Sequence, residues 1–277
     1  MSTTVKVITG IGGMGLAIAR RLGPGSTLML ADYSADALAA AAQDLRGEGY
    51  QVITQEVDVS DPVSVAVLAR EAADVGPVTT VVHTAGLSPV QAAPGAILTV
   101  DLLGTATVLD AFEQVIAVGG AGVFIASLAG HLTPLPADVE HALSVTPTAK
   151  LLALPFLSTD AIADTTAAYG ISKRANHLRV AAAAHTWGLR GARVNSISPG
   201  IIATPMAQAE LASRAGKPMQ AMISASATGR HGTAEDIAAA ADFLTGPHAT
   251  FITGTDLLVD GGVVAAIHNG RVDVSRG

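Results

Sequence analysis

A tyrosine and a lysine stand four residues apart in the segment Tyr169–Lys173 (Y-G-I-S-K). On a helix these two side chains share one face, and a nearby ammonium group favours the phenolate form of a tyrosine. The pKa of Tyr169 is then expected to fall toward the working pH, where the phenol can exchange a proton with a reacting oxygen. The spacing alone is weak, because such pairs are common on helix surfaces. The rest of the chain must supply the context.

A second candidate site follows the predicted strand at residues 5–9, which leads directly into Gly10–Gly15 (G-I-G-G-M-G). Glycines in such a turn let backbone N–H groups approach a pyrophosphate at the positive end of a helix. The next predicted strand, 27–31, is followed by Asp32, where a dinucleotide site has its acidic residue. Asp32 could accept both ribose hydroxyls and would repel a 2′-phosphate, so the sequence predicts NAD rather than NADP. The alternative is that Asp32 is merely an exposed residue at the end of a strand.

Strands and helices alternate along the whole chain and must position these residues. Further strands are predicted at 52–57, 79–83, 122–126, 192–196 and 256–259. Helices are predicted at 14–22, 35–46, 62–73, 96–118, 167–187 and 234–244. The strands are continuously apolar, as burial on both faces requires. The sequence therefore predicts a single doubly wound α/β Rossmann domain over residues 1–277, with a parallel sheet of about seven strands and helices on both faces.

In their order along the chain, these motifs resemble the short-chain dehydrogenase/reductase family from about residue 5 to residue 262. The matching pieces are the glycine turn, Asp58-Val59, Ala85-Gly86, Ser127 to Gly130, Tyr169 with Lys173, Arg193 to Asn195, Pro199 to Thr204, and Val259 to Gly262. The resemblance implies an oxidoreductase that transfers a hydride between NAD(H) and a secondary alcohol or ketone.

The resemblance also implies a role for each matching residue. Tyr169 would be the acid/base, Lys173 would lower its pKa and hold the nicotinamide ribose, and Ser127 would position the substrate oxygen. The residues implied to bind the cofactor are Gly10, Gly13, Met14, Gly15, Asp32, Asp58, Val59, Ala85, Gly86, Tyr169, Lys173, Pro199, Gly200, Ile202 and Thr204. Taken singly, Ser127 could instead cap a strand end, and Thr204 could cap a helix.

The chain departs from the family pattern near both candidate sites. The glycine turn has one residue fewer between Gly10 and Gly13, a change that cofactor binding should survive. Asp101 stands where the family usually has an asparagine that takes part in a proton relay. An aspartate beside Lys173 would keep the lysine charged and cancel part of its field on Tyr169, so alcohol oxidation would favour alkaline pH. Alternatively, Asp101 points elsewhere and bonds the backbone, and both interpretations stay open.

Ser127 and Tyr169 lie much farther apart than in most family members, which implies a segment inserted at about 131–165 with a helix near 138–144. A similar insertion occurs in the bacterial 3α-hydroxysteroid dehydrogenase/carbonyl reductase branch, where it contributes to subunit contacts. The resemblance therefore favours an interface role for the insertion over a lid. It also implies a homodimer or homotetramer, while residues 263–277 form a C-terminal extension.

Composition excludes several function classes. The net charge is −7 and no stretch clusters Lys and Arg, which disfavours nucleic acid and membrane surfaces as partners. The chain has no cysteine, and its eight histidines show no metal-ligand spacing, so no metal site is predicted. A strand begins almost at the N-terminus, leaving no room for a signal peptide, and we expect a cytoplasmic protein.

The stretch 205–229 occupies the position of the family's substrate loop. Its apolar side chains predict a hydrophobic alcohol or ketone as substrate, unless they simply pack on the core: Met206, Leu211, Met219, Met222 and Ile223. Two other functions remain open. A dehydratase or epimerase on the same fold would keep the cofactor site and use Tyr169 differently, and a non-catalytic NAD-binding protein would not need all of Ser127, Tyr169 and Lys173.

Overall fold

The computed structural model describes residues 3–158, 160–204, 207–208, 212 and 216–272. Its centre is a seven-stranded sheet with the order β3-β2-β1-β4-β5-β6-β7, and all neighbouring strands run parallel. The strands are β1 (Val5–Thr9), β2 (Thr27–Asp32), β3 (Gln51–Glu56), β4 (Val78–His83), β5 (Ile116–Ile125), β6 (Arg193–Pro199) and β7 (Asp256–Val259). The predicted doubly wound Rossmann fold is confirmed.

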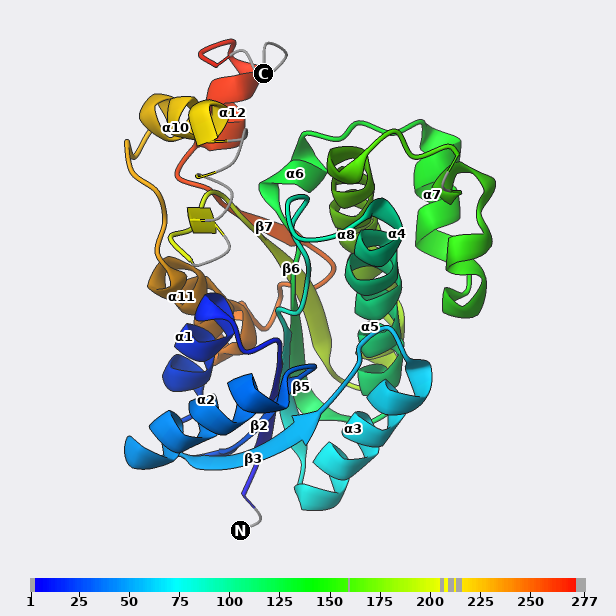
Figure 1. The fold of residues 1–277 in the computed structure, drawn as a ribbon. Coiled ribbons are helices and arrows are strands. Elements are labelled where there is room, and N and C mark those ends of the chain that lie inside the picture. Colours follow the sequence, from blue (N-terminus) through cyan, green and yellow to red (C-terminus); the bar gives the residue numbers. More distant parts are fainter. Residues whose placement is uncertain (1–2, 159, 205–206, 209–211, 213–215, 273–277) are drawn as a thin grey trace.

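Helices cover both faces of the sheet (Figure 1). One layer consists of α1 (Gly13–Leu22), α2 (Ala35–Gly47) and α11 (Ala234–Thr245). The other consists of α3 (Pro62–Val75), α5 (Thr105–Glu113) and α8 (Thr165–Leu189). Two further helices, α10 (Gly216–Ala225) and α12 (Val263–His268), lie together beyond the carboxyl ends of the strands.

The central strands are buried because both of their faces meet a helix layer. Nearly every residue of β1, β2 and β4 is buried, which agrees with their continuous apolar character. Strand order reverses between β1 and β4, so the loops after these two strands diverge and leave a crevice at the carboxyl edge of the sheet. All predicted cofactor and catalytic residues lie near this edge or on the helices that border it.

The helix predicted at 96–118 ends too late. The helical segment runs through α4 (Pro94–Ile97), the π-helical η1 (Leu98–Gly104) and α5, and β5 already begins at Ile116. The apolar stretch after α5 suits a strand as well as a helix, and pairing with β4 decides the outcome. Among the described residues, Pro94–Glu113 alone is long and apolar enough to cross a membrane, but 61% of its most apolar window is buried, as in a core helix.

The inserted stretch folds onto the outer side of α8. It begins as α6 (Leu128–His131) ends, and it contains α7 (Ala137–Val145), η2 (Thr148–Ala153) and η3 (Pro155–Leu157). Buried Arg179 of α8 donates hydrogen bonds to the carbonyl groups of Leu143 (3.1 Å) and Thr146 (2.9 Å), while Arg174 pairs with Glu140 at 2.6 Å. The helix predicted near 138–144 is present as α7, and its role in subunit contacts stays a prediction.

Parts of two predicted regions lie outside the described residues. These are Met206 and Leu211 of the substrate loop and residues 273–277 of the C-terminal extension.

Candidate active site

Tyr169 and Lys173 lie on one face of α8, as their spacing predicts. The ammonium nitrogen of Lys173 lies 5.3 Å from the centroid of the Tyr169 ring. Asp101, in the π-helical η1, is fully buried, and its Oδ2 lies 3.3 Å from Lys173 Nζ. Its Oδ1 accepts a hydrogen bond from the backbone N–H of Leu87 at 2.7 Å. Asp101 therefore does not point away from Lys173: one oxygen faces the lysine while the other bonds the backbone. Its effect on the pH dependence of the reaction stays a prediction.

Burial and charge oppose each other in this pair. Burial alone would lower the pKa of the Lys173 ammonium group, but Asp101 and Tyr169 outweigh it and raise that pKa above its ordinary value. Burial also raises the pKa of the Asp101 carboxyl group, against the opposing influence of Lys173 and the Leu87 N–H. Gly86 lies against the pair, because a Cβ there would be 3.3 Å from Lys173 Nζ. Lys173 is thus held as a buried cation beside the phenol.

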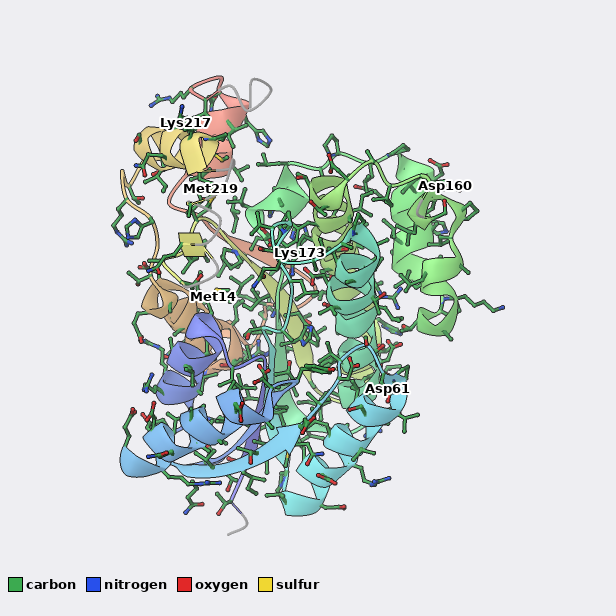
Figure 2. The ribbon with its side chains drawn as sticks, in the orientation of Figure 1. Met14, Asp61, Asp160, Lys173, Lys217 and Met219 are labelled. Carbon is green, nitrogen blue, oxygen red and sulfur yellow. The ribbon has the colours of Figure 1, made fainter. Side chains whose placement is uncertain are left out.

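Ser127 follows the end of β5 and caps the short helix α6. Its Oγ accepts a hydrogen bond from the backbone N–H of Ala129 at 3.2 Å, at the N-terminus of α6. It also lines a cavity of about 710 Å³ together with Tyr169. The capping role and an active-site position are therefore compatible. In Figure 2, Met14 of α1 and Met219 of α10, which line the same cavity, both lie to the left of Lys173, which lies near the centre of the view.

A second cavity, of about 570 Å³, lies over the glycine turn. Gly10 has a φ of +87°, and a Cβ there would collide with the backbone of Ala85. A Cβ at Gly15 would collide with the carbonyl group of Gly10. The predicted residues that line this cavity are Gly10, Gly13, Met14, Gly15, Asp32, Asp58, Val59, Ala85, Gly86 and Thr204. Met14 and Thr204 line both cavities, so the two form neighbouring parts of one crevice.

Asp32 lies at the end of β2 with both carboxylate oxygens fixed by the backbone. Its Oδ2 accepts from the N–H of Ile11 at 2.7 Å, and its Oδ1 accepts from the N–H of Ser34 at 2.9 Å. In the loop after the neighbouring strand β3, Asp58 accepts from the N–H of Ser60 at 2.9 Å. The two carboxylates border the same end of the cavity, where an adenosine would lie in a dinucleotide-binding fold.

The loop after β6 closes the other end of the crevice. Pro199, Gly200, Ile202 and Thr204 all line the larger cavity, and Thr204 Oγ1 also accepts from the N–H of Ala207, which is a helix-capping contact. Two backbone hydrogen bonds of 2.8 Å join this loop to Gly232: the N–H of Gly232 donates to the carbonyl group of Ile201, and the N–H of Ala203 donates to the carbonyl group of Gly232.

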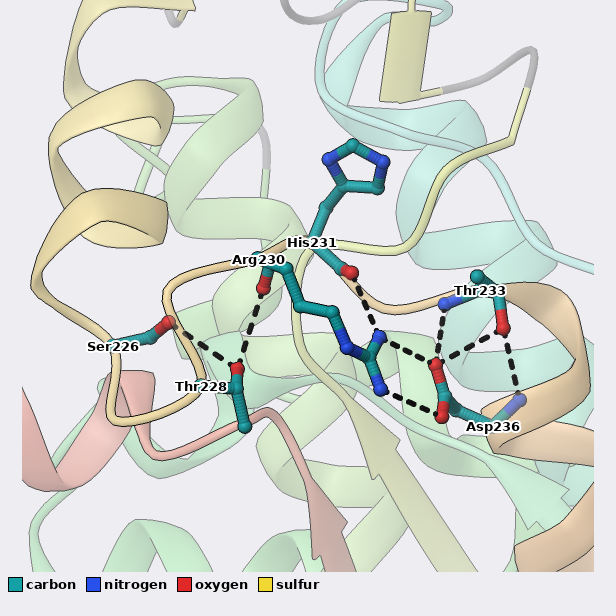
Figure 3. Close-up of polar contacts among 6 residues, drawn as sticks. All are labelled: Ser226, Thr228, Arg230, His231, Thr233 and Asp236. Carbon is teal, nitrogen blue, oxygen red and sulfur yellow. Dashed lines mark hydrogen bonds and ion pairs between the residues drawn. The ribbon is translucent and has the colours of Figure 1, made fainter.

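A polar network holds the segment that carries Gly232 (Figure 3). Arg230 donates to Asp236 in a bidentate pair of 2.9 and 3.0 Å, while Thr233 and Asp236 form a capping box at the start of α11. This pairing lowers the pKa of Asp236 well below its usual range. The network ties the loop after β6 to α11.

Several residues at the site lie outside the motifs of the sequence. Thr165 and Thr166 line the larger cavity one turn before Tyr169, and their helical spacing is a signal that could have indicated this. His83 lies fully buried at the end of β4, between the hydroxyls of Thr9 (2.7 Å) and Thr105 (3.2 Å). Burial lowers its pKa to about 3, so it is neutral at physiological pH.

Comparison with known proteins agrees with this geometry. A family model described as enoyl-(acyl carrier protein) reductase matches residues 10–264. The short-chain dehydrogenase/reductase bsc3 of Alternaria brassicicola is 41% identical over 269 residues, which cover 96% of this chain and 97% of that protein. The chain belongs to the short-chain dehydrogenase/reductase family. It is therefore an oxidoreductase of a family that binds nicotinamide cofactors and acts on alcohols and ketones.

Other members differ in their named substrate or cofactor. Galactitol 2-dehydrogenase (L-tagatose-forming) of Cereibacter sphaeroides is 34% identical over 272 residues, covering 92% of both chains. A blue fluorescent protein from a metagenomic library, solved in complex with NADPH, matches with a TM-score of 0.73 and 25% identity. That match covers 94% of this chain and 97% of the other. The similarity of the insertion to the 3α-hydroxysteroid dehydrogenase/carbonyl reductase branch stays a prediction.

Proposed function

We propose that this protein transfers a hydride between NAD(H) and an apolar secondary alcohol or ketone, using Ser127, Tyr169 and Lys173. The observation that carries the proposal is that Ser127 and Tyr169 line one cavity with Lys173 held as a buried cation beside the phenol. That cavity shares Met14 and Thr204 with the cavity over the glycine turn. A dinucleotide lying along both cavities would bring its nicotinamide end to Tyr169.

The proposed roles follow from the chemistry of each group. Ser127 would donate a hydrogen bond to the substrate oxygen and hold it near Tyr169. Tyr169, as the phenolate, would take the hydroxyl proton during alcohol oxidation and return it during ketone reduction. Lys173 would favour the phenolate through its positive charge. NAD, when bound, supplies the hydride acceptor or donor, and the protein supplies orientation and charge.

Asp32 supports a preference for NAD over NADP. A carboxylate at this position accepts hydrogen bonds from the ribose hydroxyls and repels a 2′-phosphate. Among the described residues that line this cavity there is no lysine or arginine that could bind such a phosphate. The NADPH-bound neighbour means that the fold itself can hold a cofactor with a 2′-phosphate, so the proposed preference rests on these side chains. Kinetics with both cofactors at matched concentrations test it directly.

The larger cavity supports an apolar substrate. None of its described lining residues is charged, and its polar groups are mainly the hydroxyls of Ser127, Thr165, Thr166, Tyr169 and Thr204. Apolar side chains supply much of the remaining wall, among them Val90, Leu128, Ile201, Met219 and Met222. A polyol would leave most of its hydroxyls without partners against such a wall, whereas a hydrophobic alcohol would gain from burial.

The decisive experiment combines a substrate panel with two variants. Secondary alcohols and ketones of increasing size are tested for NADH formation or consumption, beside sugar alcohols. We expect turnover with the apolar compounds, and loss of at least about a thousandfold in kcat for Tyr169→Phe, with NADH binding retained because the ring is kept. Ser127→Ala should lower kcat while leaving the affinity for NADH unchanged.

Two results would point to the alternative functions. Conversion of a substrate without net change in NADH would indicate a dehydratase or epimerase. Tight NADH binding with no turnover on the whole panel would indicate a non-catalytic NAD-binding protein.

A further inference from the structure

A polar cluster lies directly behind the helix that Ser127 caps. His131, the last residue of α6, donates from Nε2 to Asp256 Oδ2 of β7 at 2.7 Å. Ser196 of β6 donates to Asp256 Oδ1 at 2.6 Å, and His177 Nε2 of α8 lies 3.5 Å from the same oxygen. The rings of His131 and His177 have their centroids 4.7 Å apart. The Asp256 carboxylate thus connects α6 to β6 and β7 by hydrogen bonds, and His177 of α8 lies beside it.

Helix α6 needs such support because it is a single turn. Only Leu128–His131 are helical, which is far too short for stability without tertiary contacts. The turn lies directly on α8, since a Cβ at Gly130 would be 2.6 Å from His177 Cε1 and 2.9 Å from the carbonyl group of Lys173. The position of Ser127 relative to Lys173 is therefore set by how firmly this turn is held at its far end.

We propose that the hydrogen bond between His131 and Asp256 is a brace that fixes Ser127 in register with Tyr169 and Lys173. The bond is well protected, because the Asp256 side chain is only 11% exposed and that of His131 is 28% exposed. His131 is a positioning residue: it lies four residues beyond Ser127, on the opposite end of the turn, and the structure shows its bond going to the sheet. The proposed effect on catalysis rests on the function proposed above.

His177 joins the cluster as an uncharged hydrogen-bonding group. Facing His177 are Asp256, His131, Arg174 and Lys173, and burial, the largest influence, lowers the pKa of His177 to about 4. His177 is therefore a neutral member of the cluster at physiological pH, where its Nε2 lies 2.7 Å from Ser198 Oγ.

A metal ion is the competing explanation for two histidines and an aspartate whose ligand atoms all lie within 4.8 Å of one another. Metal-bound histidines normally donate their second ring N–H to an acceptor. The buried Nδ1 of His177 has no hydrogen-bond partner within the described part of the chain. The three residues also already bond to one another or to serine hydroxyls. Hydrogen bonds account for the cluster without an ion.

The test compares two substitutions of nearly equal size at one position. His131→Gln keeps a donor close to the position of Nε2, whereas His131→Met keeps the volume and removes the donor. We expect His131→Gln to retain kcat within about threefold, and His131→Met to lose at least about tenfold, because small misplacements of a reacting group are costly. The KM for NAD should change by less than about twofold in both variants, since the cluster lies away from the glycine turn. His141→Gln, at an exposed histidine of α7, is the matched control.

Amide hydrogen exchange of the peptide covering residues 126–133 gives a readout that does not depend on activity. We expect faster exchange in this peptide for His131→Met alone, with the peptides of the glycine turn unchanged. Equal rates and equal exchange for the Gln and Met variants would overturn the brace. So would a chelator that reproduces the Met effect in the wild-type protein, because a metal would then hold the cluster. If the wild type turns over no substrate, the proposed function fails, and the exchange comparison alone still decides whether the brace exists.

Discussion

Replacing Asp101 by asparagine removes the negative charge closest to Lys173 while preserving the shape of the side chain. The amide oxygen can still accept from the N–H of Leu87, which now bonds Asp101 Oδ1 at 2.7 Å. The variant therefore isolates the electrostatic contribution of a buried carboxylate 3.3 Å from the Lys173 ammonium group. In the wild type this carboxylate opposes the phenolate form of Tyr169, because two negative charges then share a buried site.

The size of the effect follows from the distances. Asp101 Oδ2 lies 3.3 Å from Lys173 Nζ, and Nζ lies 5.3 Å from the centroid of the Tyr169 ring. The distance from the carboxylate oxygen to the ring centroid therefore cannot exceed the sum of these two distances. At roughly 8 Å and an effective dielectric constant of about 20, two unit charges interact by about 2 kcal/mol, or roughly 1.5 pH units. Removal of the Asp101 charge should therefore move the acid limb of alcohol oxidation to lower pH by about 1 to 1.5 units.

A second change is expected at alkaline pH. Burial acts to lower the pKa of Lys173, and Asp101 is the main group that opposes it. In Asp101→Asn that pKa falls, so the lysine loses its charge at a lower pH and the rate turns down earlier. The wild type should thus work best at more alkaline pH than the variant, with a broader alkaline plateau.

The assay is the pH dependence of kcat/KM for alcohol oxidation at saturating NAD. Asp74→Asn, an exposed aspartate of α3, serves as the matched control and should leave the profile unchanged. Superimposable profiles for wild type and Asp101→Asn would refute the reasoning, as would a shift of the acid limb to higher pH.

Three further outcomes are expected. Asp32→Ser should lower the ratio of kcat/KM with NAD to that with NADP by at least about tenfold, because the 2′-phosphate is no longer repelled. The free energy of unfolding should fall as the pH drops below about 6.5, because the folded pKa values of His83 (about 3) and His177 (about 4) lie below the unfolded value. At pH 5, protonation of each histidine in the unfolded chain lowers the free energy of unfolding by about 2 kcal/mol, which urea unfolding would measure. Arg179→Met should reduce the free energy of unfolding by about 2 kcal/mol, because it leaves one buried and one partly buried carbonyl group of the insertion without donors.

Each outcome has its own check. An unchanged cofactor ratio in Asp32→Ser would remove the support for NAD preference. In His83→Gln, unfolding at acid pH should take up one proton fewer, so the free energy of unfolding should depend less steeply on pH. An unaltered slope would contradict this linkage between protonation and unfolding. For Arg179, Arg190→Met at the exposed end of α8 is the control, and equal losses in both variants would contradict a specific anchor for the insertion.

Much of the fold follows from local sequence signals. β1, β2 and β4 are mostly apolar, non-alternating runs whose burial on two faces leaves little choice of structure, and glycine turns and caps mark the helices between them. The end of α5 and the start of β5 could not be predicted, because Ile116 enters the sheet through pairing with Val78, across a register shift. The π-helical turn that carries Asp101 has no local signal either.

The cluster behind Ser127 shows a different limit of sequence reasoning. His131, His177 and Asp256 are separated by tens of residues and lie on three elements, so no spacing connects them. Only the parallel pairing of β6 with β7, which places Ser196 beside Asp256, and the packing of α8 on β6 bring them together. Such clusters depend on tertiary packing, and motif order does not reveal them.

Asp32 shows how the glycine turn bears on the proposed preference for NAD. With two lone pairs on each oxygen, a carboxylate offers about four acceptor sites, and the N–H groups of Ile11 and Ser34 occupy one on each oxygen. One site remains on each oxygen, which matches the two ribose hydroxyls of NAD. Ile11 belongs to the glycine turn, and its N–H bonds Asp32 Oδ2. The turn thus holds the carboxylate in place at the end of β2. An NADP molecule would have to bring its phosphate against that fixed charge, which supports discrimination by repulsion rather than by a movable side chain.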